Sequence, residues 1–281
     1  MRIVTWNLNQ RVGDAVWNAL LKLEPDIALL SEVNPNSIPE EMLRKSGYES
    51  QFEQATKKDG TCQRFKTGMI VKGEIGESFE LLADKEWINQ GLQKYSGNFV
   101  SREVRLPDHP TYNVISVHMP SWQFPHWDFT NEDVSGVMLP NYDEMYMSEL
   151  LWFALKNTMH KPHGIFIIGG DFNTSEFIGS TKKRRAANCE AIRRICNLGF
   201  IEAVRHCHGR PIPSYLHNKG KKRLMHQLDH LYLPQEMREQ VTSFVGDTKT
   251  YFGVDTDEIE TCSKPKLSDH LPIIADIKVC R

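Results

Sequence analysis

Short runs of apolar residues, separated by polar turns, recur along this chain and predict a protein rich in β-strands. Residues 26–31 (DIALLS) contain a continuous apolar run, which is typical of a strand that is buried on both faces. Further strands are predicted at residues 2–7, 68–72, 99–106, 112–118, 165–168, 228–233 and 273–279.

Three segments carry helical signals. Asp14 could cap a helix that ends before Pro25, and residues 145–159 form a second candidate. A third helix is predicted at residues 188–198, with its first residue, an asparagine, as the N-cap and Gly199 just beyond its end. Strands outnumber helices, and several follow one another closely enough to form hairpins. This pattern favours an α/β protein of mixed sheets packed face to face with helices outside, rather than a doubly wound Rossmann sheet.

Composition narrows the class of protein without deciding its function. The 281 residues are 40% hydrophobic, which is enough for a substantial core, and one domain over residues 1–281 is expected. The formal net charge of -2 excludes a uniformly basic nucleic-acid binder but allows a local basic patch. The six cysteines show no CxxC spacing and are expected to be reduced thiols. No apolar run suits a signal peptide or a membrane span, so we expect a cytoplasmic protein without membrane insertion, and a monomer is favoured.

Four short polar segments stand at the ends of apolar runs. They are TWNL around Asn7, SEV around Glu32, GGDFN around Asp171 and SDH around Asp269. If the runs are buried strands, these side chains gather at one rim of a sheet, where acids and amides suit a hard cation such as Mg²⁺. Taken alone, Asn7 is better interpreted as a turn residue and Glu32 as a solvated strand end. The set together predicts a hydrolytic phosphate site.

Two further pairs carry candidate chemistry. Asp171 and Asn173 are two residues apart, so in an extended segment both side chains would point the same way. The carboxylate could then deprotonate a water while the amide positions it, although an Asp/Asn turn is the alternative. Asp229 is the candidate hydrogen-bond partner of His270, which would be held charged against a phosphate oxygen.

The ordered motifs WNLN, SEV, VHMP, GDFN, LDHLY and LSDHLPI resemble the endonuclease/exonuclease/phosphatase superfamily over nearly the whole chain. This superfamily includes DNase I, repair nucleases, deadenylases, sphingomyelinases and inositol-polyphosphate phosphatases. The resemblance implies a four-layered α/β sandwich and Mg²⁺- or Mn²⁺-dependent cleavage of a phosphoester. It also implies the following roles: metal binding for Asn7, Glu32 and Asp269; water activation and positioning for Asp171 and Asn173; and stabilisation of phosphate charge for His270 with Asp229.

One further pair and two departures refine the resemblance. His118 stands where the repair-nuclease branch carries a tyrosine. The DNase I, sphingomyelinase and phosphatase branches carry a histidine at this position, as this chain does. Arg102 and Glu103 look like the Arg-Glu pair of DNase I, so Glu103 is expected to orient His118, which could protonate the leaving oxygen. Gln227 and His230 depart from the residues usual around the LDY-like motif, so contacts at the rim of the site are expected to differ.

Two basic runs and an aromatic segment bear on the substrate. The runs are expected to be loops and contribute eight positive charges, without which the net charge would be -10. They comprise Lys182, Lys183, Arg184 and Arg185, and then Lys219, Lys221, Lys222 and Arg223. Placed beside catalytic strands, they would attract a polyanion, although solvated loops are the alternative. Trp122 and Trp127 lie in a long segment where aromatic rings could stack on a base, cover a small ligand or anchor the segment to the core.

Three functions therefore remain open. The first is a Mg²⁺-dependent nuclease acting on DNA or RNA, which the basic runs favour. The second is a phosphodiesterase or phosphatase of a small phosphate ester or phospholipid headgroup, which the net acidity and aromatic segment permit. The third is a catalytically inactive binding module, against which the intact set of polar residues argues.

Overall fold

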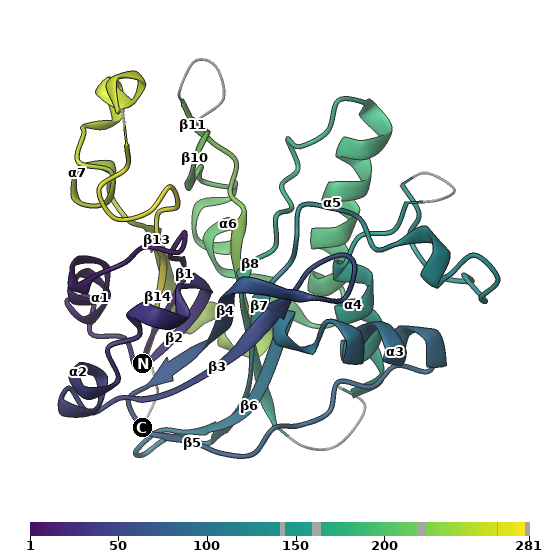
Figure 1. Cartoon of the computed structure of the whole chain (residues 1–281), viewed down its shortest axis with the longest axis horizontal. Coiled ribbons are helices and arrows are strands. Elements are labelled where there is room, and N and C mark those ends of the chain that lie inside the picture. Colours follow the sequence, from purple (N-terminus) through teal and green to yellow (C-terminus); the bar gives the residue numbers. More distant parts are fainter. Residues whose placement is uncertain (141–143, 159–163, 218–222, 263, 279–281) are drawn as a thin grey trace.

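The computed structural model describes residues 1–140, 144–158, 164–217, 223–262 and 264–278. Within them, two six-stranded mixed sheets pack face to face, with helices on both outer faces (Figure 1). The first sheet has the order β13-β14-β1-β2-β4-β3, with strands Val241–Val245, Ile273–Ile277, Arg2–Asn7, Ile27–Val33, Cys62–Val71 and Glu49–Thr56. The second has the order β5-β6-β7-β8-β12-β9, with strands Glu74–Ile75, Phe99–Arg105, Thr111–His118, Ile165–Asp171, Asp229–Pro234 and Phe200–Glu202. This is the predicted four-layered α/β architecture.

Three apolar layers hold the sandwich together. The middle layer lies between the sheets and contains Leu29 of β2 and Ile167 of β8, both fully buried. One outer layer packs α1 (Asp14–Leu21) and α2 (Glu40–Lys45) against the first sheet. The other packs α3 (Glu86–Lys94), α4 (Ser148–Thr158) and α5 (Lys182–Cys196) against the second sheet. Because β2 is covered on both faces, its sequence IALL has to be apolar at every position.

The third predicted helix starts earlier than expected. Helix α5 runs from Lys182 to Cys196, and its N-cap is Thr181, whose hydroxyl accepts a hydrogen bond from the Arg184 amide at 3.2 Å. The prediction that Asn188 caps this helix is wrong, because the preceding Lys, Arg and Ala residues are themselves strong helix formers. Asn188 is buried inside the helix, and its side-chain amide donates to the Arg184 carbonyl oxygen at 3.0 Å. The first basic run is therefore the opening turn of a helix and not a loop.

The remaining elements lie outside the two six-stranded sheets. They are the hairpin β10 (Tyr215–His217) and β11 (Arg223–Met225), α6 (Ala203–His208) and α7 (Thr248–Tyr251), together with short 3₁₀ turns.

Helix α1 begins at Asp14 after Gly13, so Asp14 is its first residue and does not cap it as predicted. The five described cysteines form no disulfide with one another. No helix in the described ranges combines the length and apolar character required to cross a bilayer.

Candidate active site

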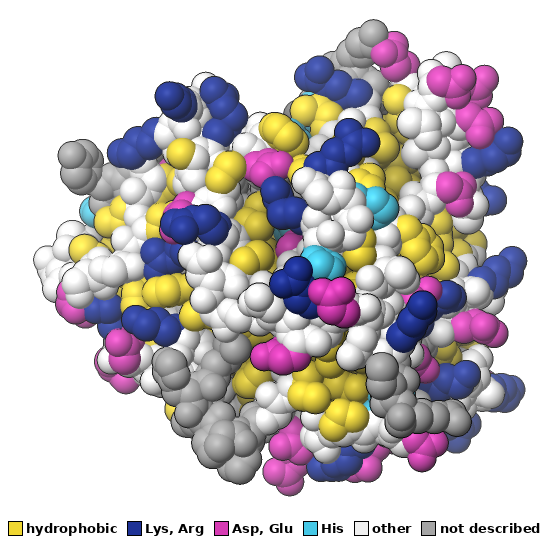
Figure 2. Space-filling view, turned by 180° about the vertical axis from the view of Figure 1, so that it is seen from behind, with side chains coloured by type: hydrophobic (Ala, Val, Ile, Leu, Met, Phe, Trp, Pro, Cys, Tyr) yellow, Lys and Arg dark blue, Asp and Glu magenta, His cyan; other side chains and the backbone are white. Residues whose placement is uncertain are grey.

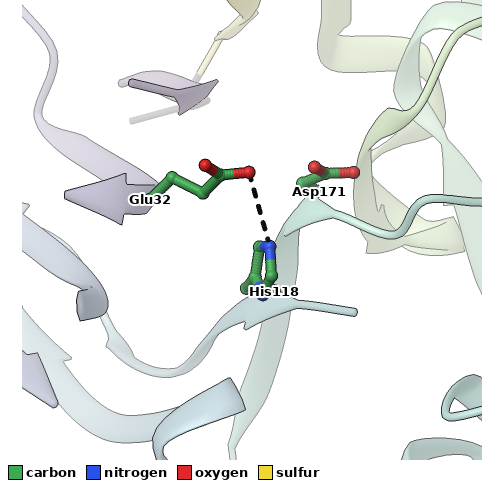
Figure 3. Close-up of side chains that lie close together, drawn as sticks. All are labelled: Glu32, His118 and Asp171. Carbon is green, nitrogen blue, oxygen red and sulfur yellow. Dashed lines mark ion pairs between the residues drawn. The ribbon is translucent and has the colours of Figure 1, made fainter. Parts of the chain in front are cut away.

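Strand register brings the predicted polar residues to one rim. In the second sheet, Asp171 at the end of β8 is paired with His118 at the end of β7 and with Asp229 at the start of β12. In the first sheet, Asn7 at the end of β1 is paired with Ser31 of β2, one residue before Glu32. Glu32, His118 and Asp171 consequently approach one another across the two sheets (Figure 3).

The side chain of Asn7 bridges the two central carboxylates. Its Nδ2 donates to Asp171 Oδ2 at 2.8 Å and to Glu32 Oε1 at 3.0 Å. Its Oδ1, the atom expected to bind metal, accepts a hydrogen bond from the Asn9 amide at 2.8 Å. In this arrangement Asn7 orients the two carboxylates, and its nitrogen rather than its oxygen faces them.

Glu32 is an ionised carboxylate in a constrained position. It sits at a β-bulge of β2 with a backbone φ of 47°, and His118 Nε2 lies 3.7 Å from its Oε1. Burial alone would raise the pKa of Glu32, but the hydrogen-bonding and charge contributions of His118, together with the Asn7 amide, lower it to about 2.

Glu32, His118 and Asp171 form the candidate metal site of the described residues. One ligand atom from each lies within 4.8 Å of the others, and the set of two carboxylates and an imidazole fits a divalent cation. A cation bound here would polarise a phosphoester oxygen. Asp269, also expected to bind metal, lines the same cleft, where burial raises its pKa, but it is not one of these three residues.

His270 is held by the partner that the sequence predicted. Its Nδ1 lies 2.6 Å from Asp229 Oδ2, and both side chains are buried. Burial alone would lower the pKa of His270, but the Asp229 carboxylate, followed by Asp171 and Asp269, raises it to about 10. The imidazole is therefore doubly protonated at neutral pH, and its second N–H is available to a phosphate oxygen in the cleft.

Asp171 and Asn173 meet through a turn and not through an extended segment. Asn173 has a φ of 46°, its amide donates to Asp171 Oδ1 at 2.8 Å, and its Nδ2 donates to the Met119 carbonyl oxygen at 2.8 Å. The expectation of extended geometry is thus wrong, since strand β8 ends at Asp171. Burial raises the pKa of the Asp171 carboxyl, the direction that suits a general base.

The predicted contact between Glu103 and His118 is wrong. Glu103 is paired with Asn113, five residues before His118 along β7, and its carboxylate accepts a hydrogen bond from Arg105 at 3.1 Å. His118 instead packs edge-on against Phe65, with 4.7 Å between ring centroids. Its Nδ1 is buried and has no hydrogen-bond partner among the described residues.

The residues predicted to bind substrate differ in their surroundings. Lys182, Lys183 and Arg185 are exposed on the first turn of α5, and Arg223 is exposed where β11 begins. Trp122 lines the cleft, while Trp127 is 68% exposed with Lys58 Nζ 5.5 Å from its ring centroid. Arg184 is engaged in an ion pair with Glu144. Lys219, Lys221 and Lys222 lie outside the described residues.

A third histidine, His230, lies next to the site, and the sequence predicted no role for it. His230 points to the opposite side of β12 from Asp229, is 2% exposed, and its Nε2 lies 2.9 Å from the Thr174 carbonyl oxygen. Gln227 lies beside it and donates to Glu202 Oε1 at 2.9 Å. Burial would lower the pKa of His230, but the nearby Glu202 carboxylate raises it. This contact fixes the segment that carries Asn173.

Replacing His230 with phenylalanine is expected to lower kcat about tenfold with little change in KM, since a displaced Asn173 would no longer be aligned for the reaction. The unpaired Thr174 carbonyl oxygen should also lower the free energy of unfolding by about 1–3 kcal/mol. Steady-state kinetics and denaturant unfolding measure the two effects. Tyr232→Phe on the same strand is the control, and His230→Gln, which keeps an N–H donor, should recover part of kcat. A change in KM alone would contradict the positioning role.

The arrangement faces an open cleft of about 520 Å³. Residues lining it include Glu32, His118, Asp171, Asn173, Asp269, His270, Trp122 and Tyr215. A buried base, a protonated imidazole and a site for a divalent cation around one opening can together activate water and stabilise negative charge on a phosphoester.

Comparison with solved structures shows the same fold over the whole chain. The 3′ phosphatase NExo from Neisseria, bound to a product DNA hairpin, is 16% identical, with a TM-score of 0.64 and coverage of 99% of this chain and 100% of that one. An AP endonuclease from Archaeoglobus fulgidus is 16% identical, with a TM-score of 0.62 and the same two coverages. The human Nocturnin catalytic domain with bound sulfate is 14% identical, with a TM-score of 0.60 and coverage of 99% of this chain and 93% of that one.

A search of curated proteins gives no match. The model of the Endonuclease/Exonuclease/phosphatase family matches residues 4–270, which include every residue described above as lining the cleft. With this match over nearly the full length and a fold shared with the solved structures, the chain belongs to the endonuclease/exonuclease/phosphatase family of phosphoesterases.

Proposed function

We propose that this protein is a Mg²⁺-dependent phosphodiesterase whose substrate is nucleic acid. The observation that carries the proposal is the joint placement of Asp171, Glu32 and the His270–Asp229 pair around one open cleft. Few protein ligands and an open site are typical of Mg²⁺ centres that act on phosphates.

Each side chain has a distinct part in the proposed reaction. Asp171 accepts a proton from the attacking water, and Asn173 helps to position that water. His270, kept charged by Asp229, stabilises the negative charge that grows on the phosphate. We assign to His118, whose Nε2 lies 3.7 Å from Glu32 Oε1, the protonation of the leaving oxygen. Glu32 and Asp171 would hold the cation, which supplies further positive charge when it is bound.

The surface favours a polymeric substrate. The first turn of α5 presents three exposed cationic side chains, and α5 and the β10–β11 hairpin both stand at the rim in Figure 1. On the opposite view in Figure 2, basic and acidic side chains are interspersed. An exposed tryptophan beside Lys58 also suits a base and its phosphate. The DNA hairpin in the NExo structure supports the same substrate class by analogy.

The alternative substrate is a small phosphate ester. A cavity of about 130 Å³ beside the cleft favours it, because the alcohol of a small ester would fit there. The protein would be incubated with Mg²⁺ and single- or double-stranded DNA, RNA or a small aryl phosphodiester. Which of them it cleaves distinguishes the nucleic-acid substrate from the small ester. The nucleic-acid proposal requires cleavage of at least one polymer.

Neutralising Lys182, Lys183 and Arg185 together with glutamine is expected to weaken nucleic-acid binding and flatten its salt dependence. Each phosphate contact contributes about 0.7–0.9 to the slope of log K against log salt, so the slope should fall by about 2. A salt series of cleavage rates measures this. The control neutralises Lys22, Arg44 and Lys72, which are exposed near the opposite ends of the strands. Equal slopes for the two triple variants would remove α5 from the binding surface.

A further inference from the structure

A small cavity opens beside the catalytic cleft. It has a volume of about 130 Å³ and shares Pro120, Ser121, Trp122, Asn173 and Ile178 with the cleft. Since Asn173 contacts Asp171 directly, a group seated in this cavity would be attached close to the reacting phosphate. The cavity is thus placed to select what the phosphate carries.

Aromatic rings form the walls of the cavity, and their positions are fixed. Trp122 packs against Tyr95 with 5.7 Å between ring centroids. The Tyr146 hydroxyl accepts a hydrogen bond at 3.2 Å from the side-chain amide of the buried Asn188. Phe172 is 3% exposed and packs edge-on against Tyr232. A planar ring could enter without rearranging these walls, which limits the entropy cost of binding.

The charge in the cavity favours a neutral polar group. Arg184 is the one cationic residue among the described residues that line it, and its guanidinium is engaged by the Glu144 carboxylate. A second phosphate would have to compete with that carboxylate. Asn173, Asn188 and Ser121 also line the cavity and offer donors and acceptors to a ring that carries both.

The volume limits the size of that ring. An engineered protein cavity of about 150 Å³ holds benzene, so about 130 Å³ accommodates one six-membered ring but not a fused bicyclic purine. We propose that this cavity binds the pyrimidine base of the nucleotide next to the scissile phosphate. The inference rests on the proposed action on nucleic acid and assigns a base preference to it.

Binding tests the cavity independently of cleavage. Calorimetry with the wild-type protein would compare uridine 5′-monophosphate, adenosine 5′-monophosphate and ribose 5-phosphate. We expect uridine monophosphate to bind at least about fivefold more tightly than either of the others, the size of one net hydrogen bond. Equal binding of ribose 5-phosphate would overturn the proposal in favour of a sugar site, and equal binding of adenosine monophosphate would overturn the size argument.

Two substitutions at Ser148 separate volume from polarity. Ser148 lines the cavity, is 4% exposed, and its hydroxyl has no hydrogen-bond partner among the described residues. Ser148→Leu should fill the space and reduce the affinity for uridine monophosphate to that for adenosine monophosphate. Ser148→Ala leaves the space open and should keep the preference. If Ser148→Leu does not fold, the nucleotide series on wild type and Ser148→Ala decides the question.

Cleavage kinetics distinguish failure of this inference from failure of the proposed function. Dinucleotides would carry a pyrimidine or a purine on either side of the phosphate. On one side the pyrimidine should give a higher kcat/KM than the purine, and Ser148→Leu should abolish that difference. Cleavage of all of them at equal rates, with no binding preference, would overturn the cavity inference and leave the nuclease proposal standing. Selective binding of uridine monophosphate without cleavage of any nucleic acid would support the cavity and overturn the nuclease proposal.

Discussion

Replacing Asp171 with asparagine is expected to lower kcat about a thousandfold, within the range that a general base contributes. The change keeps the shape of the side chain and removes its capacity to accept a proton. Asp171 is 1% exposed, and burial raises the pKa of its carboxyl, so keeping this carboxylate charged costs more free energy in the folded protein than in the unfolded chain. The neutral asparagine should therefore leave the melting temperature unchanged or raise it.

The joint result distinguishes a catalytic role from a structural one. Turnover on the cleaved substrate and the melting temperature would be measured on the same preparation. Asp276→Asn is a matched control, because Asp276 pairs with Arg2 on β1, at the end of the strand opposite to Asn7. We expect that variant to keep its turnover. Near wild-type kcat in folded Asp171→Asn would show that another group activates the water.

Removal of the divalent metal is expected to abolish activity, and Glu32→Gln is expected to raise the Mg²⁺ concentration required for half-maximal rate at least about tenfold. Loss of an outer partner of a metal ligand already costs about 10–100-fold in affinity, and Glu32 is placed to be a ligand itself. Its low pKa means that the carboxylate remains charged down to mildly acidic pH, so the effect should persist between pH 5 and 8.

A titration of rate against Mg²⁺ after treatment with chelator gives both quantities. Glu53→Gln serves as the control, since Glu53 lies on β3 and pairs with Arg102 away from the cleft. Full activity in excess chelator would contradict metal dependence. An unchanged Mg²⁺ requirement in Glu32→Gln would remove Glu32 from the metal site.

The polar rim could be predicted because much of its information is local. Asn7, Glu32 and Asp171 lie at or near the ends of apolar strands, and a strand places its last residues at the edge of the sheet. The Asp229–His270 pair could be predicted for a chemical reason, since a phosphate-binding imidazole requires a carboxylate partner. Nearly all residues of β2 and β8 are buried, because the two sheets pack face to face, and this packing brings the polar residues of the first sheet close to those of the second.

Other features depend on register and distant packing. Glu103 was expected to orient His118 by resemblance to an Arg-Glu pair, yet five residues of register separate its cross-strand partner from His118. His230 finds Thr174, 56 positions earlier in the chain, and its neighbour Glu202 lies on the edge strand β9. Asn188 has the residue type of a cap but lies where helix formers already precede it. For Glu103 and His230, nothing in the local sequence distinguishes the alternatives, whereas for Asn188 the preceding helix formers do.

Glu32 carries its carboxylate on a backbone whose φ is 47°, a region in which a residue with a β-carbon is disfavoured by about 1–2 kcal/mol. Glycine would relieve that strain and remove the carboxylate at the same time. If Glu32 binds the metal as proposed, selection for the reaction opposes that stability gain and keeps the glutamate. In gene copies released from that selection, glycine at this position should be among the earliest substitutions to become fixed, and it would mark a descendant that has kept the fold and lost the chemistry.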